Sequence, residues 1–333
     1  DQAEEGDILI LKEGIYSGSI SIRKSVVIHG EDGAVIEGDK KGNVITIEAD
    51  QVEIRKLYVK GSGRDKKDSG IFIEQGTGHV IEENVIAEVQ NGIYVNDGKE
   101  HTFRDNSMTS YSGHFSERGS GIHLYKGSGH KVEGNYMAGV QDGLYLDNTT
   151  DITVLANEAA GSRYGFHFMF SEDLTVERNE LTKNVTGMMI MDSAGVKLRE
   201  NEINEQFHVR GFGIILYDSD DLMLSNNEMK GNSTGLSMEK TRNVKITRNS
   251  ISGNQVGLEF IGENENNVFS ENNFIGNVVQ SKIANSSMRL DDGSSGNYWD
   301  DYSSFDITGD GYGEITYKAG SLYDQLRERE RHT

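Results

Sequence analysis

Cysteine and proline are both absent from this chain of 333 residues. Without cysteine, the chain can form no disulfide bond and offers no thiolate to a metal ion, although this alone does not identify a compartment. Average proline usage of about 5% predicts well over ten prolines in a chain of this length. Natural chains with many turns rarely avoid proline entirely, so its absence favours an engineered or redesigned sequence.

Long apolar runs and excess positive charge are lacking as well. No apolar segment approaches the roughly 18 residues of a membrane-spanning helix. The net charge of −21 argues against nucleic-acid binding, because a phosphate backbone requires a basic surface. The sequence begins at Asp1 with no secretory signal, so we expect an exported protein to be seen here in its mature form.

Glycine, in contrast, is abundant, and seven glycines recur in steps of 22 residues with a single step of 26. They are Gly121, Gly143, Gly165, Gly187, Gly213, Gly235 and Gly257. Six of these units carry an asparagine at the same offset: Asn135, Asn157, Asn179, Asn201, Asn227 and Asn249. A repeat this short fits one coil of a β-helix, and no helical apolar period of 3.6 residues is present. The sequence therefore predicts an all-β, single-stranded, right-handed parallel β-helix.

Variations in the repeat suggest the organisation of the chain. We expect the β-helix to span residues 1–295, with a capping segment over 296–333 whose charged end forms a short helix. Residues 97–120 lack apolar periodicity and predict a lateral loop. The 26-residue step adds four residues to the usual 22 and predicts an insertion loop over 202–212.

Side chains alternate across a strand, so the position of each glycine indicates which residues face inward. The first and third residues after every repeat glycine are apolar and are expected to face the lumen. The second and fourth then face outward, and on two adjacent coils they are His167, Met169, Met189 and Met191. Coils stack about 4.8 Å apart and alternate residues lie about 6.6 Å apart, so these four side chains are expected to form one patch.

The chemistry of this patch suits a soft metal ion. Thioether sulfur favours Cu(I) over Zn²⁺, Ca²⁺ or Mg²⁺, and histidine adds an imidazole nitrogen. Spacing alone leaves two other interpretations open, because methionine often fills cores and apolar patches often bind proteins. The insertion could carry His208 beside the patch, whereas His123 lies two coils from His167 and is expected to stay outside it. The remaining histidines are interpreted as surface or turn residues: His29, His79, His101, His114 and His130.

One acidic segment partly matches a calcium loop. The run from Asp306 to Glu314 places Asp306, Asp310 and Gly311 as such a loop would, but no glutamate stands at the twelfth position. An acidic turn is favoured over a Ca²⁺ site.

Several segments together resemble a known family. They are GSGRDKKDSGIFIE at 61–74, SERGSGIHLY at 116–125, GFHFMFSED at 165–173, GMMIMDS at 187–193, GNYWDDY at 296–302 followed by GDGYGE, and LYDQL near the end. Over nearly its whole length the chain resembles NosD, the extracytoplasmic β-helical family required for maturation of nitrous oxide reductase in denitrification.

The resemblance implies a periplasmic copper-delivery role without catalysis. Proteins of this kind receive Cu(I) from a lipoprotein copper chaperone and pass it towards nitrous oxide reductase. They work on the membrane and ATPase subunits of an ABC transporter, so any membrane association would come through partners. The resemblance favours the interpretation of His167, Met169, Met189 and Met191 as transient Cu(I) ligands.

Two other functions remain open. β-Helices often act on polysaccharides as lyases or hydrolases, or bind carbohydrate. Hydrolysis needs paired carboxylates, whereas the outward positions supply only the scattered acids Asp147, Glu239 and Glu259, with no aspartate beside an arginine or lysine at matching positions. We therefore expect no enzymatic activity. A designed solenoid without any ligand is the third interpretation.

Overall fold

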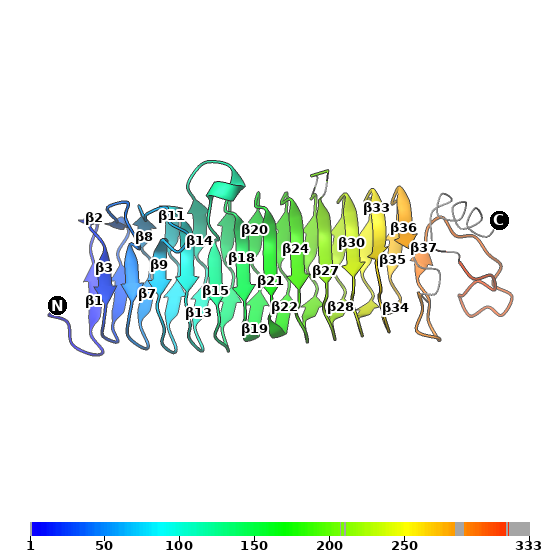
Figure 1. The fold of residues 1–333 in the computed structure, drawn as a ribbon, viewed down its shortest axis with the longest axis horizontal. Coiled ribbons are helices and arrows are strands. Elements are labelled where there is room, and N and C mark those ends of the chain that lie inside the picture. The colour runs from blue at the N-terminus through cyan, green and yellow to red at the C-terminus, as the bar shows by residue number, and fades with distance from the viewer. Residues whose placement is uncertain (1, 207, 210, 284–289, 318, 320–333) are drawn as a thin grey trace.

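The computed structural model describes residues 2–206, 208, 209, 211–283, 290–317 and 319. The chain winds into an elongated rod of stacked coils that runs from the N-terminus at one end to the C-terminus at the other (Figure 1). Each coil contributes one strand to each of three parallel sheets. The parallel β-helix predicted from the repeat is thus confirmed, with coils of 22 residues through most of its length.

The first sheet has twelve strands among the described residues. They are β1 (Ile8–Leu11), β4 (Val27–Gly30), β7 (Glu53–Arg55), β10 (Val80–Glu82), β13 (Thr102–Arg104), β16 (Lys131–Glu133), β19 (Thr150–Leu155), β22 (Glu172–Glu177), β25 (Lys197–Arg199), β28 (Met223–Ser225), β31 (Lys245–Thr247) and β34 (Val268–Ser270).

The second sheet has thirteen strands in the same part of the chain. They are β2 (Gly14–Ser17), β5 (Ala34–Glu37), β8 (Tyr58–Lys60), β11 (Val85–Val89), β14 (Ser107–Ser110), β17 (Tyr136–Ala138), β20 (Glu158–Ala160), β23 (Glu180–Thr182), β26 (Glu202–Asn204), β29 (Glu228–Lys230), β32 (Ser250–Ser252), β35 (Asn273–Ile275) and β37 (Tyr298–Trp299).

The third sheet carries the patch predicted from the sequence, and twelve of its strands are described. They are β3 (Ile20–Ile22), β6 (Ile45–Ile47), β9 (Ser69–Ile73), β12 (Asn91–Val95), β15 (Ile122–Tyr125), β18 (Asp142–Asp147), β21 (Tyr164–Met169), β24 (Thr186–Met191), β27 (Phe212–Tyr217), β30 (Thr234–Glu239), β33 (Val256–Ile261) and β36 (Val279–Ile283).

The repeat glycines lie where the chain turns into the third sheet, and close packing between coils requires them. A Cβ added at Gly187 would lie 2.5 Å from the carbonyl oxygen of Gly213 and 2.3 Å from the buried side chain of Ile203. Both distances are shorter than carbon atoms tolerate, so any larger residue would push the coils apart. The apolar residues one and three positions after the glycines are all buried, as their spacing predicts.

The asparagines form a buried ladder at the turn between the first two sheets. The Asn157 side-chain amide donates to Oδ1 of Asn179 at 3.0 Å, and Asn179 donates to Oδ1 of Asn201 at 2.9 Å. Each amide also donates to a backbone carbonyl of the preceding coil, as Asn179 does to Val154 at 3.1 Å. The asparagines at the constant offset therefore join each coil to the next by hydrogen bonds.

Three histidines form a stack inside the coils, which corrects their interpretation as surface or turn residues. The rings of His79 and His101 lie 4.5 Å apart, those of His101 and His130 lie 4.8 Å apart, and all three residues are completely buried. Nδ1 of each ring accepts a hydrogen bond from a backbone N–H of the preceding coil, as His101 does from His79 at 3.2 Å. Burial lowers the pKa of all three, to about 2 for His101 and about 4 for His130.

The two expected loops are shorter than the sequence suggests. Strands β13 and β14 lie within 97–120, and residues 119–121 form backbone hydrogen bonds with neighbouring coils. The excursion is therefore limited to residues 111–118, which contain a short 3₁₀ helix, η1 (Phe115–Glu117), that projects from the rod (Figure 1). The segment 202–212 begins with strand β26 and ends with the first residue of β27, leaving residues 205–211 as the connection.

The segment after residue 296 still contributes to the solenoid. Strand β37 pairs with β35, and Trp299 stacks on Phe274 with ring centroids 4.0 Å apart. The ring of Tyr317 lies 4.5 Å beyond Trp299. The helix expected at the charged end of the chain falls on residues 320–333, outside the described residues. Among the residues described, no helix has the length and apolar character needed to span a membrane.

Candidate functional site

The four residues of the predicted patch lie in register on two neighbouring strands of the third sheet. On β21 and β24, His167 pairs with Met189 and Met169 pairs with Met191. All three methionines are half-buried, and His167 is 7% exposed. One imidazole and three thioethers therefore occupy neighbouring positions on one face of the sheet, as alternation predicts. Hereafter these four residues are called the His–Met patch.

A buried carboxylate holds the histidine of the patch. Nδ1 of His167 lies 3.1 Å from Oδ2 of Asp142, a residue at the start of β18 with a side chain only 1% exposed. Arg163 holds the same carboxylate with two hydrogen bonds, from Nε at 2.9 Å and from Nη2 at 2.6 Å. The Arg163 guanidinium also lies over the ring of Tyr164, whose edge meets His167.

The charge of Asp142 is balanced inside this cluster. Burial raises the pKa of Asp142, but hydrogen bonds from His167 and Arg163 and the positive charge of Arg163 outweigh that effect, so the net pKa is lowered. The carboxylate consequently stays ionised, and an ionised carboxylate accepts hydrogen bonds without donating any.

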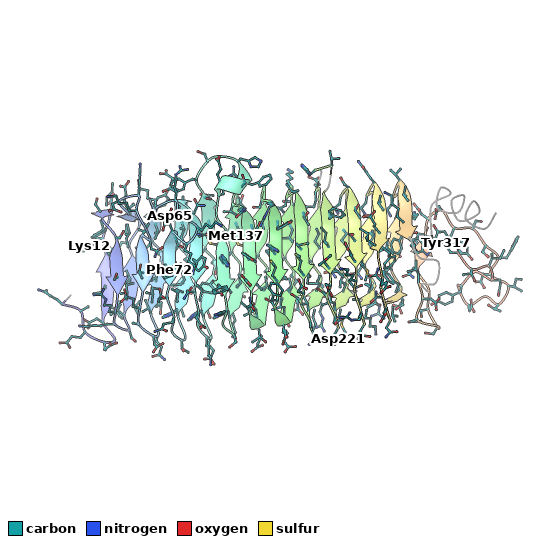
Figure 2. All side chains as sticks on the ribbon, viewed as in Figure 1. Lys12, Asp65, Phe72, Met137, Asp221 and Tyr317 are labelled. Carbon is teal, nitrogen blue, oxygen red and sulfur yellow. The ribbon has the colours of Figure 1, made fainter. Side chains whose placement is uncertain are left out.

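His167 also ends a column of stacked rings along the outer face of the third sheet. The column starts at Phe72, labelled in Figure 2, and continues through Tyr94, His123 and Tyr145, with neighbouring centroids between 4.3 and 5.7 Å apart. Tyr145 lies almost parallel to His167, at 4.6 Å and 8°. The stack holds the His167 ring from one side, while Met189 follows it on the other.

Tyr145 links the stack to a methionine of the patch. Its hydroxyl lies 3.4 Å from the sulfur of Met169 and 3.4 Å from the carboxylate of Asp147. Burial raises the pKa of Tyr145 to about 12, with a further contribution from the negative charge of Asp147, so the phenol keeps its proton and can donate it.

The two histidines of the column differ in ways that matter for binding. Burial lowers the pKa of His123 to about 4, and its Nε2 is buried without a hydrogen-bond partner in the described chain. His123 is separated from His167 by Tyr145, in agreement with its predicted place outside the patch. Nε2 of His167 makes no hydrogen bond to any described residue, and the His167 side chain as a whole is 9% exposed.

The donor set of the patch suits a soft ion. In the part of the chain that the structure describes, no three histidine, aspartate or glutamate side chains are grouped so that they could hold a metal ion. Carboxylates are the ligands that Mg²⁺ and Ca²⁺ prefer, whereas the His–Met patch offers sulfur and one nitrogen. Its chemistry therefore matches Cu(I) better than a hard divalent cation.

His208 and Asp306, also considered as ligands, make contacts within their own loops. His208 is exposed in the 205–211 connection, and its carbonyl accepts hydrogen bonds from Gly211 and Ser233. Asp306 accepts backbone N–H groups from Gly309, Asp310 and Gly311, the pattern of a tight acidic turn. Its carboxylate thus stabilises its own loop, which agrees with the interpretation favoured over a calcium site.

Asp142 and Arg163 are functional candidates that sequence reasoning missed. They lie one and two residues before repeat glycines, whereas alternation predicts side-chain direction only forward from each glycine. A Cβ on Gly187 would point at core Ile203, so glycine and the next residue both face inward and alternation breaks there. The sequence shows no aspartate beside an arginine at matching positions on adjacent coils, and Asp142 does pair in register with Tyr164, but Arg163 reaches across that register to form an ion pair with Asp142 at 2.6 Å.

The family of the chain follows from its sequence match. A model of the family described as periplasmic copper-binding protein (NosD) matches residues 104–304, more than half of the chain and all of the cluster just described. The chain belongs to the NosD family. No curated protein matches the chain significantly.

Solved structures share the architecture of this NosD-family chain at low identity. The A-module of mannuronan C-5 epimerase AlgE6 from Azotobacter vinelandii is 14% identical with a TM-score of 0.72, covering 88% of this chain and 90% of that one. The surface adhesin PfbA of Streptococcus pneumoniae is 9% identical with a TM-score of 0.66, covering 82% and 84%. An exopolygalacturonase from Thermotoga maritima is 10% identical with a TM-score of 0.61, covering 79% and 84%.

These likenesses correct one expectation. The sequence led us to expect no enzymatic activity, and this is contradicted because several of the similar structures are enzymes, among them the epimerase and the exopolygalacturonase. At 9–15% identity the likeness establishes the shared fold and assigns no reaction to the NosD-family chain.

Proposed function

We propose that this chain acts outside the cytoplasmic membrane as a Cu(I) delivery protein, with the His–Met patch as its transient binding site. It receives Cu(I) from a lipoprotein chaperone and passes it on for the maturation of nitrous oxide reductase, working with an ABC transporter. Membership of a periplasmic copper-binding family supports this role. The single observation that carries it is the register of β21 and β24, which brings three thioethers beside one imidazole.

The chemistry of these ligands fits delivery better than storage. Thioether and imidazole are neutral ligands, so Cu(I) can bind without the loss of protons that thiolates would require. Half-buried methionines at the surface leave the ion open to a partner. An ion held in this way can be exchanged between proteins.

The test is an anaerobic Cu(I) titration against a competing chromophoric chelator. We expect saturation at one ion per chain, and affinity reduced at least about tenfold in Met169→Ala/Met191→Ala, which corresponds to ~1.4 kcal/mol. Met223→Ala is the matched control, because Met223 is a half-buried methionine on the first sheet, paired with Lys197 and Lys245. Equal affinity in the patch variant and the control would refute the site, and no binding by the wild-type chain would refute the function.

A second candidate is a reaction on an acidic polysaccharide. Tyr145, His167 and Arg163 meet on the outer face of the third sheet, and such groups serve as acid, base and carboxylate-binding residue in proton transfer to sugars. To test this, polyuronates are incubated with the protein. Absorbance detects unsaturated products of a lyase reaction, and NMR detects changed stereochemistry of the sugar units. Turnover that is lost in Tyr145→Phe would favour this function over copper delivery.

A further inference from the structure

We infer that Asp142, anchored by Arg163, is a positioning residue that fixes the ring of His167 so that Nε2 is the atom offered to Cu(I). This inference rests on the proposed function and names what prepares the binding site.

The hydrogen bond to Asp142 decides which nitrogen carries the proton. The Asp142 carboxylate is held by two Arg163 hydrogen bonds, so it acts only as an acceptor. Nδ1 of His167 at 3.1 Å must then donate. In a neutral imidazole one nitrogen carries the proton, so Nε2 keeps the lone pair that a metal ion requires.

The surroundings fix the direction of the ring as well. Tyr145 is stacked at 4.6 Å and 8°, and the edge of Tyr164 meets the ring at 4.8 Å. The Asp142 side chain is 1% exposed and Arg163 lies over Tyr164, so the support itself is rigid. Nε2 is left without a hydrogen bond to any described residue, on a side chain that is 9% exposed and whose coil neighbour is Met189.

The chain contains its own contrast to this arrangement. His79, His101 and His130 accept backbone N–H groups at Nδ1, so each of them must carry its proton on Nε2. His167 is expected to have the opposite tautomer. A metal ligand oriented by a carboxylate at its second nitrogen is a recurrent arrangement, and loss of such a partner typically weakens metal binding about 10- to 100-fold.

The first measurement is the tautomer of His167 in the whole, metal-free protein, from ¹⁵N NMR of the histidine rings. The His167 signals are assigned by their loss in His167→Gln. We expect the proton on Nδ1 of His167 and on Nε2 of the three stacked histidines. A proton on Nε2 of His167 would overturn the inference, and this result requires no change at Asp142.

The second measurement compares the Cu(I) affinity of Asp142→Asn with that of Asp220→Asn. Both variants lose a carboxylate that is paired with an arginine, but Asp220 pairs with Arg242 and lies at a turn outside the His–Met patch. We expect affinity to fall about 10- to 100-fold in Asp142→Asn and to stay within about twofold in Asp220→Asn. The ¹⁵N signals of the stacked histidines report whether Asp142→Asn remains folded.

The outcomes separate the inference from the proposed function. Unchanged affinity in a folded Asp142→Asn, with binding lost in Met169→Ala/Met191→Ala, overturns the positioning role and leaves the function standing. Absence of Cu(I) binding in the wild-type chain overturns the function, and with it the assignment of Nε2 as a donor. Equal losses of Cu(I) affinity in both aspartate variants would show that the loss reflects only the removal of one negative charge, which also overturns the inference.

Discussion

Single residues inside this solenoid form contacts with both neighbouring coils. Asn179 shows this most clearly: Oδ1 accepts from the backbone and the side chain of Asn157, and Nδ2 donates to Asn201 and to the carbonyl of Val154. The residue is 1% exposed, so water cannot replace these partners. One side chain thereby joins three coils.

Removing this side chain is expected to be costly. Asn179→Ala should lower the free energy of unfolding by about 3 kcal/mol, because several buried donors and acceptors lose their partners at ~1–3 kcal/mol each. The melting temperature and the denaturant midpoint measure the change. Glu180→Ala, an exposed residue next in the chain, is the control and should change stability by less than about 0.5 kcal/mol. Equal effects of the two substitutions would contradict the ladder's contribution.

The sequence contains a signal that would have placed the three stacked histidines in the core. His79, His101 and His130 each stand five residues before a ladder asparagine: Asn84, Asn106 and Asn135. In later coils the same place before the asparagine holds Ile152 and Leu174, both buried. The constant offset therefore marks a core position, but the lateral loop lengthens one spacing to 29 residues and hides the repeat.

At the scale of strands and coils, alternation predicts contacts wherever the backbone is regular. It located the His–Met patch because β21 and β24 pair without interruption. It failed at the break beside the glycines, where Asp142 and Arg163 lie, because that break depends on how closely neighbouring coils approach. The alternation of residues predicts register within a strand. Contacts made by residues at the turns into the sheet can be found only once the packing of neighbouring coils is known.

The histidine stack also makes stability depend on pH. Its pKa values are lowered by burial in the folded chain, while an unfolded histidine titrates near pH 6.5, so the unfolded chain binds more protons below that pH. Stability is therefore fully present above about pH 6.5 and falls as pH drops towards 4, where His130 titrates, and further towards 2 for His101.

The expected slope is about 1.4 kcal/mol per pH unit for each such histidine. His101→Leu introduces the kind of aliphatic side chain that later coils carry at this position, as Leu174 does. It should reduce the slope of unfolding free energy against pH by the contribution of one histidine. Melting temperatures of both proteins between pH 4 and about 7 measure this difference. Parallel curves would show that burial of His101 does not govern acid stability.

At the scale of the whole molecule, the repeat spacing predicts the architecture, and motifs distributed along the chain indicate its family. Both depend on features spread over the entire length: glycines that permit close stacking, asparagines that join coils, and inward apolar residues. The proposed function, in contrast, depends on a few outward side chains on two coils. Fold relatives as different as an epimerase and an adhesin show that this architecture leaves the outer face free to diverge.

Because every described strand pairs only with strands of adjacent coils, the three sheets themselves join no distant coils that would resist tension. Pulled by its two ends in an optical trap, the chain should unspool from the tips, one coil at a time. Each 22-residue coil would release roughly 75 Å of extended chain, giving a staircase of near-equal steps. Cu(I) bound across β21 and β24 would cross-link two coils, and the step that separates these coils should then need a larger force than the neighbouring steps.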